Sequence, residues 1–424
     1  YENGVVDIEV RTRDTWTLDP SVRLSRSGGA NSTGFSLKEG NLAGSGTTME
    51  LERTQDVDRT GSHVLLGHDH LFDGWTRLAL DRASFSDGSS LALDAQHPFY
   101  SFDSRWAAGA SYSRFDRVDS LYRNSEVIGK FRHQEHSWNA NAGWSAGRVG
   151  DWTSRYTTGV SYAEDVYAPD PGAPPPVPIP ADRTLAGPFV GYQRLEEDFL
   201  PIANRDRIQR PEYLPMGWNA SVQLGRSLAA FGATDQPWQL AAALGKGFRL
   251  AGDSQLLASA NYNAQYGSAI GDVRSLGGSA RYYHPQGGPF LFFLSATADT
   301  VRTASASDEL LLGGDNGMRG YPLRYQSGTR RAVFTAEERY YTDWYPFRLF
   351  RVGWAAYYDV GRAWGGQLAN ATPGWLSDVG FGLRILSARA SFGSVVHIDL
   401  AFPAHRTDPG IKARQLVVMT GTTF

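Results

Sequence analysis

Residues 351–359 read Arg-Val-Gly-Trp-Ala-Ala-Tyr-Tyr-Asp, and two kinds of side chain alternate along them. The odd-numbered residues form a face of Arg, Gly, Ala, Tyr and Asp, and the even-numbered residues form a face of Val, Trp, Ala and Tyr. A strict period of two predicts a β-strand whose two faces meet different surroundings. The pattern recurs over 378–385, 396–402 and 416–424. A soluble β-sandwich would place Lys, Glu and Thr outside, whereas Lys is scarce here, so we expect strands that face lipid.

The connections between these strands alternate between short and long. Tight turns are expected at 344–347 and 387–391, and longer loops at 361–374 and 403–412. A transmembrane barrel has short periplasmic turns and longer outer loops, with aromatic residues at the membrane interfaces. The sequence therefore predicts an all-β fold, a transmembrane antiparallel β-barrel. Aromatic residues crowd its short-turn side: Tyr340, Tyr341, Trp344, Tyr345, Phe347 and Phe350.

The composition limits the classes of function. The chain has 424 residues, of which 41% are hydrophobic and 20% charged, with 47 Gly, no Cys and a formal net charge of -3. The lack of Cys excludes disulfides, zinc–thiolate sites and thiol catalysis, and the charge gives no sign of a nucleic-acid partner. No apolar run approaches the roughly 18 residues of a spanning helix. A barrel explains this composition, because its apolar outward residues alternate with polar lumen residues.

The strand pattern continues upstream with lower contrast. Strands are expected through the N-terminal quarter and over 237–302, whereas 120–225 is ambiguous; the raw number of strands is nearer 20 than 16. Residues 169–180 hold seven of the 21 prolines, which lack the N–H that a sheet interior requires, and we expect an exposed loop there. Residues 1–18 are interpreted as the tail of a preceding periplasmic domain or a linker, and residues 19–424 as the barrel.

One segment carries the strongest candidate for a functional site. Residues 312–322 read Leu-Gly-Gly-Asp-Asn-Gly-Met-Arg-Gly-Tyr-Pro. Gly313, Gly314 and Gly317 tolerate positive φ angles and predict a chain reversal. The reversal presents Arg319, which is either solvated or tucked into the lumen against carboxylates.

Two acidic residues on the following strands favour the lumen position. Glu337 and Asp359 lie on the polar faces of adjacent predicted strands, where two carboxylates would repel each other without a cation. A guanidinium can bridge them through two-point contacts. We therefore expect Arg319 inside the barrel, within hydrogen-bonding distance of Asp359 and with Glu337 nearby.

Five motifs occur in the order found in one family. Gly-Met-Arg-Gly-Tyr at 317–321 resembles the Val-Arg-Gly-Phe/Tyr loop tip of the bacterial surface antigen superfamily, which includes BamA-type insertases, TamA-type assembly factors and two-partner-secretion transporters. The tip has Met where Val is usual. The other four motifs lie at 39–46, 336–339, 358–361 and 379–384.

The resemblance implies a barrel of 16 strands with the long loop folded into the lumen. Arg319 would anchor this loop, with Asp359 and Glu337 as its partners. Gly320 would allow the close turn of the loop tip, and Tyr321 would pack beside it.

The resemblance also implies a weak seam between the first and last strands, where a substrate polypeptide inserts or crosses. A strand near 20–28 is expected to pair with the strand 413–424 over a short length. Phe424 would be the C-terminal recognition signal, and residues 1–18 would belong to a POTRA-like periplasmic domain.

The function implied is insertion or translocation of proteins at the bacterial outer membrane, with no cofactor, metal or bond chemistry. The expected partners are outer-membrane lipids, unfolded or exported polypeptide clients, and periplasmic or lipoprotein accessory subunits, but no nucleic acid. Three alternatives stay open: a two-partner-secretion pore for one dedicated exoprotein, a passive porin, and the barrel part of a fused outer-membrane hydrolase.

Two short patterns could indicate an enzyme or a metal site. Residues 143–147 match Gly-x-Ser-x-Gly, but a nucleophile elbow needs a strand–turn–helix context, and another strand is expected to follow. His68 and His70 share one strand face, but no third ligand is identified, so a plain histidine pair is the favoured interpretation.

Overall fold

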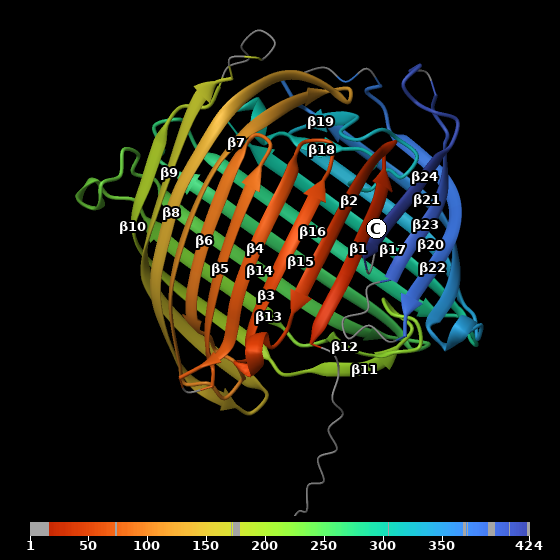
Figure 1. The fold of residues 1–424 in the computed structure, drawn as a ribbon, viewed down its shortest axis with the longest axis horizontal. Coiled ribbons are helices and arrows are strands. Elements are labelled where there is room, and N and C mark those ends of the chain that lie inside the picture. Colours follow the sequence, from red (N-terminus) through yellow and green to blue (C-terminus); the bar gives the residue numbers. More distant parts are fainter. Residues whose placement is uncertain are drawn as a thin grey trace, which may run out of the picture.

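Twenty strands follow one another around a closed barrel in the computed structural model (Figure 1). Residues 17–421 are described, apart from 73, 171, 173–178, 304, 368, 369, 371, 389–394 and 407. Each barrel strand pairs antiparallel with its neighbours in the chain, and the first strand pairs with the last. Within the described part, no helix is both long and apolar enough to cross a membrane.

The bounds of the barrel strands are β1 (Leu18–Ser27), β2 (Ala30–Glu39), β3 (Thr47–Gln55), β4 (Thr60–Leu71), β5 (Thr76–Phe85), β6 (Gly88–His97), β7 (Trp106–Arg123), β8 (Glu126–Val149), β9 (Trp152–Pro169), β10 (Arg183–Glu196), β13 (Asn219–Arg226), β14 (Trp238–Leu250), β15 (Ser254–Tyr266), β16 (Val273–Pro285), β17 (Phe290–Arg302), β20 (Arg330–Tyr341), β21 (Phe350–Trp364), β22 (Leu376–Ser387), β23 (Val395–Pro403) and β24 (Gln415–Gly421). Two small sheets pair β11 (Phe199–Ala203) with β12 (Pro211–Pro215) and β18 (Leu310–Leu312) with β19 (Gln326–Gly328). Four short 3-10 helices complete the described elements: η1 (Leu42–Gly44), η2 (Ala229–Phe231), η3 (Ala306–Asp308) and η4 (Pro346–Arg348).

The expectation of 16 strands is wrong, because the barrel has 20. The number 16 came from the family resemblance, whereas alternation alone favoured a number nearer 20. The upstream hairpins belong to the wall: β5 pairs with β6 from Phe85–Gly88 onward, and β7 pairs with β8 from Arg123–Glu126 onward. The four strands outside the barrel wall form the two small sheets, β11–β12 and β18–β19.

The predicted alternation is confirmed on β21. Trp354 and Tyr358 are each 48% exposed, whereas Tyr357 is 5% exposed and Asp359 is fully buried. The exposed apolar face continues around the barrel, which gives the wall a lipid-facing belt. Members of this belt on other strands include Leu78, Trp138, Val190, Val222, Leu244, Leu276, Leu294, Phe334 and Phe381.

The barrel has two distinct ends (Figure 1). We call the end that carries the β18–β19 sheet and the β7–β8 turn the outer end, and the end that carries the β11–β12 hairpin the inner end. The orientation of these ends in a cell stays a prediction. Most of the proline segment 169–180 and of the turn 387–391 lies outside the described residues.

Candidate functional site

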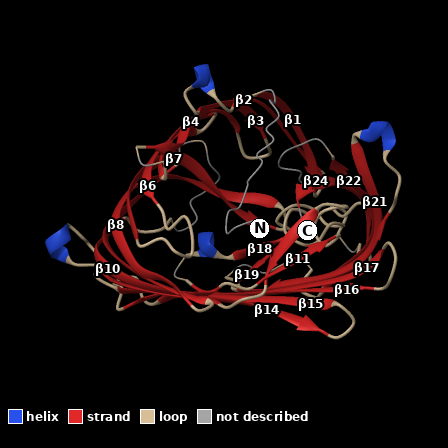
Figure 2. Cartoon of the chain, turned by 90° about the horizontal axis from the view of Figure 1, so that it is seen from below, coloured by secondary structure: helices blue, strands red, loops and turns tan. Residues whose placement is uncertain are grey.

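The segment between β17 and β20 fills part of the lumen, where Figure 2 shows β18 and β19 inside the ring of strands. The predicted chain reversal lies between these two short strands. The N–H of Met318 donates to the carbonyl of Gly313 at 3.0 Å. Gly317 has a φ of +109°, and a Cβ there would lie 2.7 Å from the side chain of Val333. Glycine at this position therefore allows both the turn and the close approach to the wall.

Arg319 lies at the tip of this segment and is fully buried. Its Nε and Nη2 atoms donate to the two carboxylate oxygens of Asp359 at 2.7 and 2.9 Å, which is a two-point contact. Its Nη1 atom lies 3.2 Å from a carboxylate oxygen of Asp399 and 3.4 Å from one of Glu337. The guanidinium carbon lies 3.2 Å from the ring centroid of Tyr357. The structure thus brings together the Arg and both acidic residues that the sequence singled out.

Sequence reasoning missed part of this ionic network. Arg384 donates to Asp399 at 2.5 Å and lies 3.3 Å from Glu337, and Arg339 donates to Glu337 at 2.9 Å. Asp378 is also fully buried, and its Oδ1 atom has no hydrogen-bond partner among the described residues. Four buried carboxylates therefore surround three guanidinium groups. The missed residues all lie on polar strand faces, but their sequence positions do not reveal which of them meets the loop tip.

The two residues after Arg319 complete the contact with the wall. The N–H of Gly320 donates to Asp378 at 3.1 Å, and a Cβ at Gly320 would lie 2.8 Å from the Cβ of Asp378. The hydroxyl of Tyr321 donates to the carbonyl of Ser377 at 3.0 Å. The loop tip therefore fits the wall closely at the position expected for Gly320 and Tyr321.

A second cluster holds the same segment at the outer end. Arg324 donates to both carboxylate oxygens of Asp58 at 2.8 and 2.5 Å, and the Tyr122 hydroxyl donates to Asp58 at 2.7 Å. The hydrogen bonds from Arg324 hold the pKa of the Asp58 carboxyl below its usual range. We call Asp58, Tyr122 and Arg324 the outer clasp. The clasp joins the loop to the β3–β4 connection and to the tip of β7.

β1 and β24 close the barrel through a short pairing, as the family resemblance implied. One register pair, Arg26 with Val418, joins these strands in the described part of the chain, whereas β1 and β2 pair over ten residues. Val22 and Leu24 are 69% and 62% exposed. A Cβ at Gly28, in the β1–β2 turn, would collide with Leu323 of the lumen segment. The loop thus lies directly against the turn beside the seam. Phe424, the expected recognition signal, lies outside the described residues.

The β11–β12 hairpin was not anticipated, and it crosses the inner end of the barrel (Figure 2). At its tip, the carbonyl of Arg205 accepts a hydrogen bond from Arg339 at 2.8 Å. Tyr283 donates to Asp206 at 3.0 Å, and Arg210 donates to the main chain at the end of β22 at 2.7 and 3.1 Å. The hairpin therefore connects β10 and β13 with the wall that carries the ionic network.

The two remaining sequence patterns have structural roles. Ser145 is buried on β8, and its hydroxyl donates to the carbonyl of Ser154 on β9, so the Gly-x-Ser-x-Gly match lies in a β-ladder. His68 and His70 use their ring nitrogens on nearby main-chain groups, at 2.8 to 3.1 Å. Among the described residues, no group of three or more His, Cys, Asp or Glu side chains is placed so that it could hold a metal ion.

No family model matches this chain, and neither does any curated protein. Solved structures do match it. BamA from Haemophilus ducreyi, in a crystal structure lacking POTRA domains 1–3, superposes with a TM-score of 0.50 over 95% of this chain and 74% of that one, at 11% identity.

The chain has the fold of the BamA barrel. CdiB from Acinetobacter baumannii and CdiB from Escherichia coli also match, at 12% and 14% identity, over 95% and 96% of this chain, with TM-scores of 0.43 and 0.49. The chain spans 59% and 63% of those two chains. A BamA-like barrel with a lipid-facing belt is located in the bacterial outer membrane, as the motifs implied.

Proposed function

We propose that this BamA-like barrel inserts or translocates polypeptides at the bacterial outer membrane, and that a client strand enters at the seam. The single register pair between β1 and β24 carries this proposal. A strand edge with unpaired N–H and C=O groups is a template for another strand. The side chains of β1 add apolar area, because Val22 and Leu24 are exposed.

In this proposal, the lumen segment sets the position of the seam. Arg319, Asp359 and Glu337 hold the segment against the wall, and Gly320 and Tyr321 fit its tip into place. The same segment lies against the β1–β2 turn. The partners are lipids of the outer membrane, unfolded polypeptide clients and accessory subunits on the periplasmic side.

The test is a disulfide across the seam, which the native chain permits because it contains no Cys. The substitutions Arg26→Cys and Val418→Cys place two thiols on directly opposed residues, where the spacing suits a disulfide. The readout is the assembly of outer-membrane proteins in cells whose own gene is replaced by the variant, with and without a reducing agent. We expect assembly to fail when the bridge is closed and to recover when it is reduced.

The matched control places the bridge between β2 and β3, through Thr33→Cys and Gln55→Cys, which are also directly opposed. This bridge should leave assembly unchanged. Normal assembly with a verified seam bridge would overturn the proposal that the seam opens.

A second candidate, export of a polypeptide through the lumen, is favoured by one observation. The lumen beside β13–β16 contains two water-accessible cavities of about 210 and 340 Å³. Closing the seam should leave this export unaffected, which separates the two candidates.

A further inference from the structure

The lumen is filled on one side and open on the other. The loop tip and the ionic network occupy the side formed by β17–β23, and the hairpin reaches from there to the inner ends of β14–β16. The neighbouring side of the wall is formed by β13–β16, because β16 pairs with β17. On these strands we consider four ranges: 219–225, 239–247, 259–265 and 275–279. Within them, every lumen-facing residue is Gly, Ala, Ser, Asn or Gln. We call this surface the amide wall.

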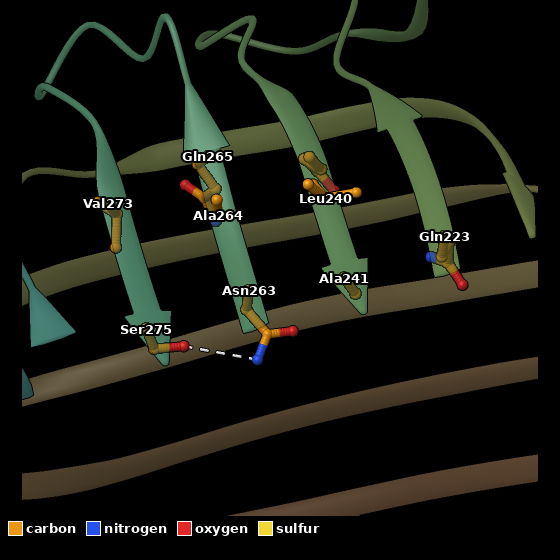
Figure 3. A pocket seen from close by; sticks show the side chains of 9 residues that line it. Gln223, Leu240, Ala241, Asn263, Ala264, Gln265, Val273 and Ser275 are labelled. Atoms are coloured by element: carbon orange, nitrogen blue, oxygen red, sulfur yellow. Dashed lines mark hydrogen bonds between the residues drawn. The ribbon is translucent and has the colours of Figure 1, made fainter. Parts of the chain in front are cut away.

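Gln223, Asn263 and Gln265 of this wall line one of the cavities (Figure 3). Gln223, Asn261 and Asn263 are exposed, although they point into the lumen. The amide nitrogen of Asn263 lies 3.5 Å from the hydroxyl of Ser275, which is a long contact. The two cavities share Gln223, Ala241 and Asn263 in their lining. The small side chain of Ala241 thus leaves a depression between two amides that have hydrogen-bonding capacity to spare.

We propose that the amide wall binds the main chain of an extended polypeptide in transit through the lumen. This inference rests on the translocation branch of the proposed function, and it names the surface that the substrate contacts. A side-chain amide donates and accepts hydrogen bonds, as a peptide group does. Asn261, Asn263 and Gln265 recur every second residue on β15, a spacing of roughly 6.6–6.8 Å that equals the two-residue repeat of an extended client chain.

The chemistry of the wall selects against other ligands. Its four ranges contain no charged and no aromatic lumen-facing residue, so within them a charged ligand finds no partner and a nucleobase finds no stacking surface. The larger cavity is also lined by Arg155 and Phe99, which already contact each other, with the Arg155 guanidinium 4.9 Å from the centroid of the Phe99 ring. A hydrogen bond that replaces one to water contributes little net free energy. Such a wall therefore holds a polypeptide weakly and accepts any sequence, as passage requires.

The experiment uses two positions on β14 that face opposite ways. Ala241 lines both cavities, whereas Leu244 is 46% exposed, belongs to the lipid-facing belt and lines neither of them. Each is replaced in turn by the photoreactive residue benzoylphenylalanine in the purified full chain. The probe is a biotinylated 30-residue peptide of Gly, Ser, Asn and Val. We expect crosslinking to the probe from position 241 and background labelling from position 244.

Two pairs of variants test the amides themselves, each combined with the photoreactive residue at position 241. Asn261→Leu with Asn263→Leu removes two amides of the wall at similar side-chain volume. We expect the crosslinking yield to fall at least about five-fold, the factor that the loss of a single hydrogen bond of about 1 kcal/mol produces. Asn139→Leu with Asn141→Leu removes two lumen amides that bond to each other at 2.9 Å, and should leave the yield unchanged.

A peptoid probe with the same side chains but no backbone N–H should crosslink several-fold less than the peptide. Equal labelling at 241 and 244, an unchanged yield with the Asn261 and Asn263 variants, or equal capture of the peptoid would each overturn the inference. The inference would also be overturned if a neutral oligosaccharide reduced crosslinking of the probe at the same concentration at which unlabelled peptide reduces it. The seam disulfide reports separately on the proposed function. If the seam bridge blocks the assembly of outer-membrane proteins but no crosslinking occurs at position 241, only the inference about the amide wall is refuted.

Discussion

Replacing Arg319 by Ala is expected to release the lumen segment while the barrel stays assembled. The substitution leaves Asp359, Asp399 and Glu337 buried with one cation fewer. Removing one partner of a buried ion pair costs about 3–5 kcal/mol. Since each 1.36 kcal/mol is a factor of ten, the opening equilibrium of the segment should rise by about 150- to 5,000-fold.

Amide hydrogen exchange in lipid nanodiscs measures this opening directly. The N–H groups of Gly320 and Tyr321 are both hydrogen-bonded, at 3.1 and 3.0 Å, and report on the docked state. Arg319→Lys keeps the charge but loses the planar two-point contact, so its exchange should fall between wild type and Arg319→Ala. Heat-modifiable migration should be retained by both variants. Exchange in Arg319→Ala within about threefold of wild type would refute the reasoning, because the buried charges would then be compensated elsewhere.

Three further predictions concern the surroundings of the segment. Asp58→Asn should speed amide exchange at Ser125, whose N–H donates to the Arg324 carbonyl at 3.1 Å. In wild type, the low pKa of Asp58 makes the stabilisation by the clasp complete above about pH 4 and lost as the pH falls through the folded-state pKa, which an exchange series over pH checks. Gly320→Ala should destabilise loop docking by about 1–3 kcal/mol, because its Cβ meets Asp378, and proteolysis of the segment in vesicles measures this. Tyr283→Phe removes the hydrogen bond to the Asp206 carboxylate at the hairpin tip and should lower the free energy of unfolding by about 1.5–3 kcal/mol in a denaturant titration. An unchanged unfolding midpoint would contradict a stabilising contact between Tyr283 and the hairpin.

The strands near the C-terminus could be predicted because their two faces differ in composition. On β21, Trp354 on one face alternates with Arg351, Gly353 and Asp359 on the other, so the pattern is local and needs no partner strand. The number of strands could not be fixed in the same way. The difference in polarity between the two strand faces is smaller in the upstream part of the chain. The motifs that resemble the surface antigen superfamily favoured 16 strands, although the alternation favoured a higher number.

The core of the candidate site followed from charge placement. Glu337 and Asp359 on adjacent lumen faces required a cation, and Arg319 was the residue on a long Gly-rich loop that could supply one. Asp399 and Asp378 were not assigned, because the depth to which the loop enters the lumen decides which wall residues it meets. The β11–β12 hairpin was missed because it lies in the stretch of lowest contrast, where strands of five residues carry little periodic signal.

Hydrogen exchange along the seam tests the central claim most directly, because it measures how readily β1 and β24 separate. The measurement compares amides of these two strands that point toward each other with interior amides of β22 in the same lipid nanodiscs. Pairing at one register position predicts at least about hundredfold faster exchange at the seam, a difference of about 3 kcal/mol in opening free energy. Equal protection at the seam and in β22 would contradict a barrel that opens between its first and last strands.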